Sequence, residues 1–329
     1  MEKVIAYTRV SQSVREKLQQ KFDVEYFENY EYINHPKFRA ALQNAIGIIG
    51  LELKVTKELL DLAPKLKIVS NISVGFDNLD IASLSKRKIM ATNTPGVLTD
   101  TVADAVLGMM LATARRIPEL DQFVKNGKWN EYLKVENFGT DLHHKKVGII
   151  GMGSIGQAIA KRCHLGFDMD ILYYNRSRKK EVENKYNSIY CSLQDLLTQA
   201  DFIVLMVPLL PETERIIGAD EFKLMKNSAI FINASRGKNI DEKALYNALY
   251  NKEILAAGID VFENEPVDPN NPLLTLDNLV TLPHLGAATV ENELAMSRLA
   301  AKNLVAGLNG EIPPNLINSE IFYSNTNNH

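Results

Sequence analysis

The sequence predicts an α/β protein of two domains, each built on a parallel β-sheet. Its 329 residues exceed what one hydrophobic core usually supports, so length alone suggests about two domains. Short apolar runs alternate with helical patterns in two successive sets, which is typical of βα repeats. A late helical pattern without a neighbouring strand predicts that one domain is discontinuous.

The first set of apolar runs lies in the N-terminal part of the chain. Polar stretches with helical periodicity, such as Val14–Lys21 and Thr56–Leu62, separate the runs. This rhythm predicts βα units around a parallel sheet. The predicted strands are Val4–Tyr7, Val24–Phe27, Ile46–Ile49, Ile68–Ile72 and Ile89–Ala91.

The second set contains six runs, which is the strand count of a complete doubly wound nucleotide-binding fold. They are Val147–Ile150, Ile171–Tyr174, Phe202–Val207, Ala229–Ile232, Ala257–Val261 and Leu279–Leu282.

Helical patterns connect the two domains. Residues 100–125 predict a long helix that starts from a Thr99 or Asp100 cap, and Pro118 is expected to kink or end it, so that two helices meet there. Leu294–Leu308 predicts a helix that crosses back to the first domain.

Composition excludes several classes of function. Hydrophobic residues make up 46% and charged residues 23%, and the net charge of −3 creates no field that would attract nucleic acid. Cys163 and Cys191 are too few for a disulfide framework or a zinc site, and the His143–His144 pair lacks metal-ligand spacing. With no signal peptide and no membrane-length apolar run, we expect a cytoplasmic protein without a bound metal.

A glycine-rich turn carries the first functional signal. Gly151, Gly153 and Gly156 form a Gly-x-Gly-x-x-Gly pattern between a predicted strand and a predicted helix. Such glycines allow the tight turn, the approach of phosphate and close helix–strand packing in Rossmann dinucleotide-binding folds. On this motif alone, an ordinary strand–turn–helix stays open.

The next predicted strand ends at a basic turn. Where an acidic residue would bind a free ribose 2′-hydroxyl, the chain has Asn175, followed by Arg176, Ser177 and Arg178. Guanidinium groups pair well with a 2′-phosphate, so we predict NADP(H) in preference to NAD(H), with NAD(H) still possible. The alternative interpretation is a solvated basic turn.

Chemistry-bearing residues follow later predicted strands at their carboxyl ends, where ligands bind in open α/β sheets. Arg236 follows the fourth predicted strand, the acidic segment Glu263-Asn264-Glu265 the fifth and His284 the sixth. An Arg can orient a carboxylate, and a His can deliver a proton. Taken singly, a surface ion pair and a packed histidine remain alternatives. In the first domain, Val74–Gly75 can aim backbone N–H groups at a carboxylate, or form an ordinary turn.

Together these segments resemble the D-isomer-specific 2-hydroxyacid dehydrogenase family, closest to its glyoxylate/hydroxypyruvate reductase and 2-ketogluconate reductase subgroup. The resemblance covers about residues 45–317. It rests on the segments Ser73 to Asn78, Asn93 to Asp100, Ala112 to Pro118, Gly151 to Gly156, the Arg236 segment, Asp260 to Phe262 with Glu265-Pro266, and Pro283-His284.

The resemblance implies a fold and a set of roles. A Rossmann domain at 100–287 would be inserted in a flavodoxin-like α/β substrate-binding domain at 1–99 and 288–329. Arg236 would orient the 2-keto acid, His284 would donate the proton and Glu265 would pair with His284. The substrate residues implied are Leu51, Val74, Gly75, Tyr132, Arg236 and His284.

The resemblance also implies a cofactor site and a homodimer. Subgroup members pair through the nucleotide-binding domain, with the segment around Gly127–Asp141 wrapping the partner. This chain departs from the pattern at Tyr132, where relatives carry a second tryptophan, and in the variable loop Leu51-Glu52-Leu53. The cofactor residues implied, beyond Gly151, Gly153, Gly156 and Asn175 to Arg178, are Thr101, Ser154, Ile155, Val207, Pro208, Thr213, Ala234, Ser235, Arg236, Asp260, His284, Gly286 and Ala287.

The function expected from sequence is NADPH-dependent reduction of small 2-keto acids, with glyoxylate or hydroxypyruvate first and 2-ketogluconate next. A formate, phosphoglycerate or D-lactate type of dehydrogenase is the alternative within the family, although formate enzymes carry a Gln where this chain has Glu265. A corepressor-like protein that senses the cofactor is the alternative outside enzymes. Neither the physiological substrate nor the direction of reaction follows from sequence.

Overall fold

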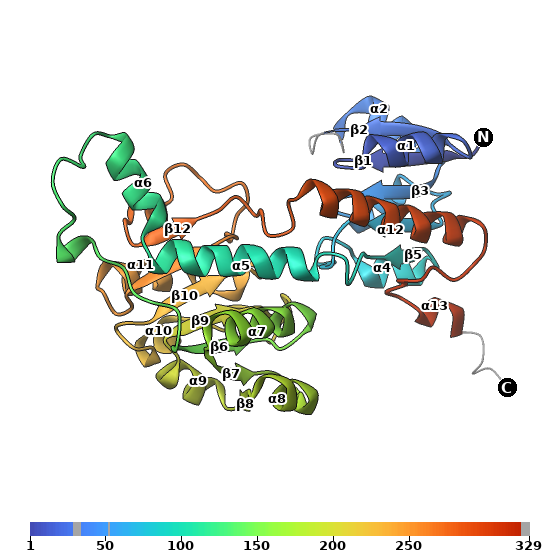
Figure 1. The fold of residues 1–329 in the computed structure, drawn as a ribbon. Coiled ribbons are helices and arrows are strands. Elements are labelled where there is room, and N and C mark those ends of the chain that lie inside the picture. The colour runs from blue at the N-terminus through green and yellow to red at the C-terminus, as the bar shows by residue number, and fades with distance from the viewer. Residues whose placement is uncertain (29–33, 52, 324–329) are drawn as a thin grey trace. The chain divides into compact units, whose positions relative to one another are not determined.

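A computed structural model describes residues 1–28, 34–51 and 53–323. The chain divides into two compact units, Met1–Leu98 with Thr289–His329, and Thr99–Ala288. Each unit has its own parallel sheet, as Figure 1 shows. The predicted α/β class, with one domain inserted in a discontinuous second domain, is confirmed.

The discontinuous unit contains a five-stranded sheet in the order β2-β1-β3-β4-β5, which is the flavodoxin-like order. All neighbouring strands pair in parallel. The strands are β1 (Lys3–Tyr7), β2 (Asp23–Phe27), β3 (Ala45–Gly50), β4 (Ile68–Asn71) and β5 (Met90–Thr92). The helices are α1 (Gln12–Gln19), α2 (Pro36–Asn44), α3 (Lys57–Asp61), α4 (Ile81–Lys86), α12 (Val290–Leu308) and α13 (Glu320–Tyr323).

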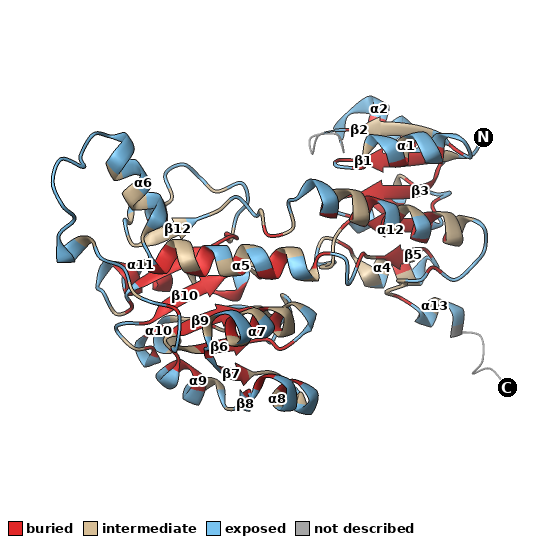
Figure 2. Cartoon of the chain, in the orientation of Figure 1, coloured by how far each residue is buried: buried red, intermediate tan, exposed pale blue. Residues whose placement is uncertain are grey.

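Apolar strands and capped helices account for this unit. Every residue of β3 is buried, as expected for a central parallel strand covered on both faces, and Figure 2 shows this strand in red. Helices α3, α4 and α12 are capped at their N-termini by the residue before the helix, whose side chain accepts a hydrogen bond from a backbone N–H group of the first turn. These capping residues are Thr56, Asp80 and Thr289. The predicted late helix, α12, packs on β3 and β4, far from it in sequence.

The inserted unit contains a seven-stranded parallel sheet in the order β12-β11-β10-β9-β6-β7-β8. The first six strands of the unit in chain order follow the Rossmann arrangement, and β12 extends the sheet beyond it. The strands are β6 (Lys146–Ile150), β7 (Asp170–Tyr174), β8 (Ile189–Tyr190), β9 (Phe202–Leu205), β10 (Ile230–Asn233), β11 (Ala256–Ile259) and β12 (Leu279–Thr281).

The predicted count of six strands is wrong because β8 was missed. This strand has two residues and lies at the sheet edge with both side chains exposed, so it leaves no buried apolar run in the sequence. The strands that precede Arg236, Glu265 and His284 are therefore the fifth, sixth and seventh of this unit.

Helices of the inserted unit cover both faces of its sheet. The long helix predicted at residues 100–125 differs from the structure in the position of its break. Helix α5 ends at Ala114, and the break lies at Arg116, whose φ is +54°. Pro118 lies in the first turn of α6, where its missing N–H costs nothing, so the break is not at the proline. The helices are α5 (Thr99–Ala114), α6 (Ile117–Lys125), η2 (Val135–Asn137), α7 (Ser154–Phe167), α8 (Lys180–Tyr186), α9 (Leu193–Gln199), α10 (Ala219–Leu224), η3 (Gly237–Asn239), α11 (Glu242–Tyr250) and η4 (Pro272–Thr275).

Among the described residues, every helix is too short or too polar to cross a lipid bilayer.

Candidate active site

The glycine turn joins β6 to α7 with the geometry that a pyrophosphate requires. Gly151 has a φ of +105°, and a Cβ on Gly156 would lie 2.2 Å from the Gly151 carbonyl oxygen. Gly153 is the N-cap of α7, and no side chain accepts a hydrogen bond from the first N–H groups of this helix. A Cβ on Gly153 would meet no atom within 4 Å, so there is space here for a phosphate to approach the helix N-terminus. These residues fit a dinucleotide.

Asn175 connects the basic turn to the glycine turn. Its Oδ1 accepts a hydrogen bond from the Met152 backbone N–H at 3.2 Å, and its Nδ2 donates to the Ser177 carbonyl at 2.8 Å. The residue that replaces the usual acid therefore braces both turns.

The two arginines of the basic turn are not equivalent. Arg178 makes a bidentate ion pair with Glu183, with N–O distances between 2.7 and 3.0 Å, and the Tyr173 hydroxyl donates to the same carboxylate at 2.7 Å. The hydrogen bonds from Arg178 and then Tyr173 lower the pKa of Glu183 to about 2, so this pair is ionised at neutral pH. Arg176 is exposed and has no ion-pair partner in the described part of the chain.

Arg236 lies in the loop after β10, and the buried Asn233 holds its backbone. Asn233 Nδ2 donates to the Arg236 carbonyl at 3.2 Å, and Asn233 Oδ1 accepts from the Ser235 hydroxyl at 2.8 Å. The Arg236 Nη1 donates to the Ser235 carbonyl at 2.8 Å. The guanidinium group is thereby half-buried and restrained at the carboxyl end of the strand.

Glu265 and His284, from the loops after β11 and β12, meet directly. His284 Nδ1 lies 2.7 Å from Glu265 Oε2, and the other carboxylate oxygen accepts from the Phe262 N–H at 2.9 Å. Burial raises the pKa of Glu265, but the hydrogen bond and charge of His284, with a contribution from the Arg236 charge, outweigh it and leave this pKa lowered. The charges of His284 and Arg236 thus both act on Glu265.

Asp260 fixes the loop that carries His284. Its carboxylate accepts from the N–H groups of Leu285 and Gly286, each at 2.8 Å, and its carbonyl accepts from the His284 N–H at 2.8 Å. His284 has a φ of +52°, a conformation that these bonds stabilise. Asp260 is 3% exposed, and burial raises its pKa. Asp260 therefore supports the backbone of this loop, and its implied contact with the cofactor stays a prediction.

Hydrogen bonds from Thr213 and Asn239 also support the loop after β9. Thr213 Oγ1 donates to the Pro208 carbonyl at 2.6 Å, and Asn239 Nδ2 donates to the Thr213 carbonyl at 2.9 Å. Asn239 is fully buried and was not predicted, because its backbone acceptors leave no signal in sequence. Of the other implied cofactor residues, Gly286 is buried, and five are half-buried: Thr101, Ile155, Val207, Ala234 and Ala287.

The remaining predicted substrate residues belong to other loops of the two units. Val74 and Gly75 form the turn after β4 in the discontinuous unit, and Leu51 follows β3 in the same sheet. Glu52 lies outside the described residues. Tyr132, in the inserted unit, is 97% exposed.

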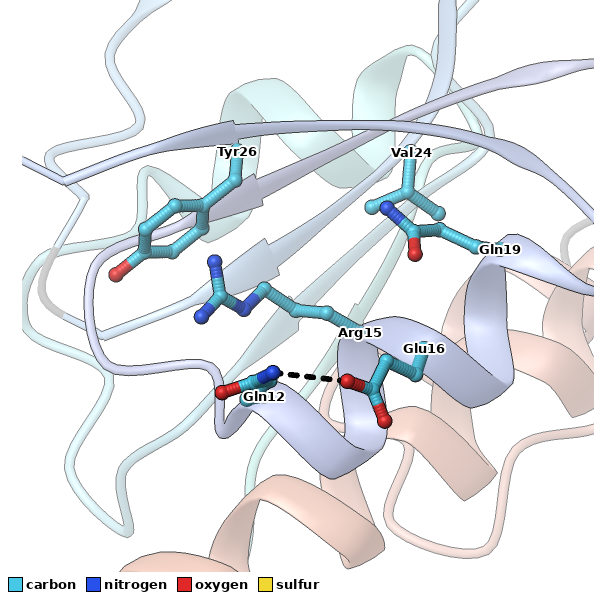
Figure 3. Close-up of a pocket in the computed structure, with 6 residues that line it drawn as sticks. All are labelled: Gln12, Arg15, Glu16, Gln19, Val24 and Tyr26. Carbon is cyan, nitrogen blue, oxygen red and sulfur yellow. Dashed lines mark hydrogen bonds between the residues drawn. The ribbon is translucent and has the colours of Figure 1, made fainter.

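A shallow hollow of about 230 Å³ in the discontinuous unit is separate from these residues. In Figure 3 the Arg15 guanidinium lies beneath the Tyr26 ring, 3.9 Å from its centroid, and Gln12 donates to Glu16 at 2.9 Å. These side chains come from α1 and β2 and include no predicted site residue.

Comparison with known proteins identifies the family. Residues 107–286 match the NAD-binding domain of D-isomer-specific 2-hydroxyacid dehydrogenases. The chain belongs to this family. This dehydrogenase is 45% identical over 320 residues, 97% of the chain and 96% of the relative, to a probable 2-ketogluconate reductase of Dictyostelium discoideum. It is 44% identical over 318 residues, 97% of the chain and 98% of the relative, to glyoxylate/hydroxypyruvate reductase B of Escherichia fergusonii.

A solved structure agrees with this assignment. The NADPH-dependent glyoxylate/hydroxypyruvate reductase of Sinorhizobium meliloti, in complex with NADP and malonate, superposes with a TM-score of 0.86 at 31% identity, covering 96% of each chain. The predicted family and subgroup are confirmed, and the dehydrogenase is an oxidoreductase of 2-hydroxy acids.

Proposed function

We propose that this dehydrogenase reduces small 2-keto acids with NADPH, glyoxylate and hydroxypyruvate first and 2-ketogluconate next. The observation that carries the proposal is the 2.7 Å contact between Glu265 and His284, beside the charge of Arg236. The names of the two sequence relatives support the choice of substrates.

The residues divide the reaction between them. A bound reduced nicotinamide supplies a hydride to the keto carbon. Arg236 binds and orients the 2-keto acid through its planar fork. His284 Nε2 gives a proton to the keto oxygen, and Glu265 on Nδ1 favours the charged imidazolium before transfer. In the reverse direction His284 takes the proton from the hydroxyl group.

The two units take different tasks in this proposal. Residues 100–287 bind the cofactor and carry Arg236 and His284. Residues 1–99 with 288–329 bind the carboxylate of the substrate through the N–H groups of Val74 and Gly75. The absence of an acid at Asn175 and the exposed cation of Arg176 support NADPH over NADH. The two unpaired cysteines are compatible with a cytoplasmic enzyme.

The test is a steady-state screen of glyoxylate, hydroxypyruvate, 2-ketogluconate and pyruvate, each with NADPH and NADH. We expect the highest kcat/KM for one of the first three with NADPH. Arg236→Lys should lower kcat/KM by about 10-fold or more, because an ammonium group cannot make the bidentate contact. A clear preference for NADH, or wild-type kcat/KM in Arg236→Lys, would contradict the respective part of the proposal.

A further inference from the structure

Three carbonyl groups in the turn after β4 are held by hydrogen bonds. The Ser73 carbonyl accepts from the Thr94 backbone N–H at 2.9 Å, and the Val74 carbonyl accepts from Asn93 Nδ2 at 2.8 Å. The Gly75 carbonyl accepts from Asn71 Nδ2 at 3.0 Å. Each of three successive peptide groups is therefore held by one hydrogen bond.

Fixing a carbonyl also fixes the next N–H group. In a trans peptide the carbonyl of one residue and the N–H of the following residue point in opposite directions. The bond to Ser73 thus orients the Val74 N–H, and the Asn93 bond orients the Gly75 N–H. Neither N–H has an acceptor in the part of the chain that the structure describes, and both residues are half-buried.

Other asparagine side chains hold these two asparagines in turn. Asn71 is 2% exposed and exchanges reciprocal amide hydrogen bonds of 3.2 Å with Asn78, which donates its other contact to the Leu53 carbonyl at 2.9 Å. The backbone carbonyl of Asn93 accepts from the fully buried Asn303 at 3.0 Å. Hydrogen bonds thus hold both donors, and those of Asn71 extend through Asn78 to the loop after β3.

We propose that Asn93 is a positioning residue: by holding the Val74 carbonyl it aims the Gly75 N–H group, next to the Val74 N–H that the Thr94 bond orients, at the carboxylate of the 2-keto acid. Successive backbone N–H groups can form a concave anion site, and its affinity depends on how little the site must reorganise. The inference rests on the proposed function, since that function places the carboxylate at these groups.

Asn93 is the residue to test, because the Val74 carbonyl that its amide holds belongs to the same peptide as the Gly75 N–H. Asn93→Ala removes the donor, and Asn93→Asp keeps the shape but turns an acceptor toward the Val74 carbonyl. We expect the KM for glyoxylate and for hydroxypyruvate to rise by the same factor, about fivefold in Asn93→Ala and more in Asn93→Asp. The kcat should change little, because the carboxylate contact is equal in ground and transition states.

A binding measurement separates positioning from turnover. The dissociation constant of oxamate, an unreactive 2-keto acid analogue, is measured by calorimetry with NADPH present and should rise with KM. The control is Asn318→Ala, which removes another buried amide of the same unit that bonds Ile89 and Ala91. This control should lower Tm while leaving KM and oxamate binding unchanged.

The outcomes are distinct. Wild-type KM and oxamate affinity in both Asn93 variants, or an equal rise of KM in Asn318→Ala, would overturn the positioning role. A wild-type protein that does not bind oxamate would overturn it as well. A wild-type protein that binds oxamate but turns over none of the 2-keto acids would instead contradict the proposed function.

Discussion

Glu265 contacts His284 at 2.7 Å, and an ion pair between them requires both an ionised carboxyl group and a protonated imidazole. Because the pKa of Glu265 is lowered below its ordinary value, the carboxylate stays charged across the neutral range. The stability that this ion pair contributes is present above the unfolded pKa of the carboxyl group and is lost as the pH falls through the lowered pKa.

Glu265→Gln should therefore alter the pH dependence of reduction. The neutral amide no longer favours the charged imidazolium, so the upper limb of the kcat/KM profile should move to lower pH by about one unit or more. The matched control is Glu263→Gln, which removes an acid of the same loop that pairs with Arg215 at 3.4 Å. An upper limb at the wild-type position in Glu265→Gln, measured from pH 5 to 9, would reject this role.

At the scale of an element, the β7–α8 connection determines the cofactor preference that we propose. Arg178 is committed to Glu183, whereas Arg176 is exposed, so Arg176 is the cation expected to meet a 2′-phosphate. Arg176→Ala should raise the KM for NADPH by about 10-fold or more and leave that for NADH unchanged.

Arg178→Ala is the matched control for this prediction. It should change the ratio of the KM for NADPH to the KM for NADH less than Arg176→Ala does. It should lower Tm instead, because it removes the charged partner of Glu183. If Arg178→Ala instead raises the ratio of the KM for NADPH to the KM for NADH more than Arg176→Ala does, Arg178 must leave Glu183 when the cofactor binds.

The same scale shows what could be predicted from sequence. Central strands such as β3 and β9 are buried on both faces and appear as continuous apolar runs, whereas the exposed two-residue β8 leaves none. The helix break at Arg116 depends on one backbone conformation that its residue type does not indicate. The positions of Arg236 and His284 after strands could be predicted because strand ends are predictable, and their roles stay predictions. The Asn93 side chain could not be predicted as a donor, because a backbone acceptor has no sequence signature.

For the whole molecule, we propose a homodimer formed through the inserted unit. The segment 127–141 exposes large apolar side chains, with exposures of 62% for Trp129, 75% for Val135 and 59% for Phe138. An apolar hollow of about 240 Å³ lies beside it on α6, lined by Leu120, Phe123, Val124, Trp129 and Leu133. Contiguous apolar surface of this kind is unfavourable in water and is typical of an interface.

A second copy of the chain is the partner implied by the family resemblance, and light scattering after size exclusion tests it. The wild-type protein should elute with twice the 36.9 kDa chain mass, and Trp129→Asp with Val135→Asp should give monomers, because two buried carboxylates would lack partners. The control is Leu165→Asp with Leu255→Asp, two exposed leucines outside the segment, which should remain dimeric. A monomeric wild-type protein at micromolar concentration would contradict the proposed interface.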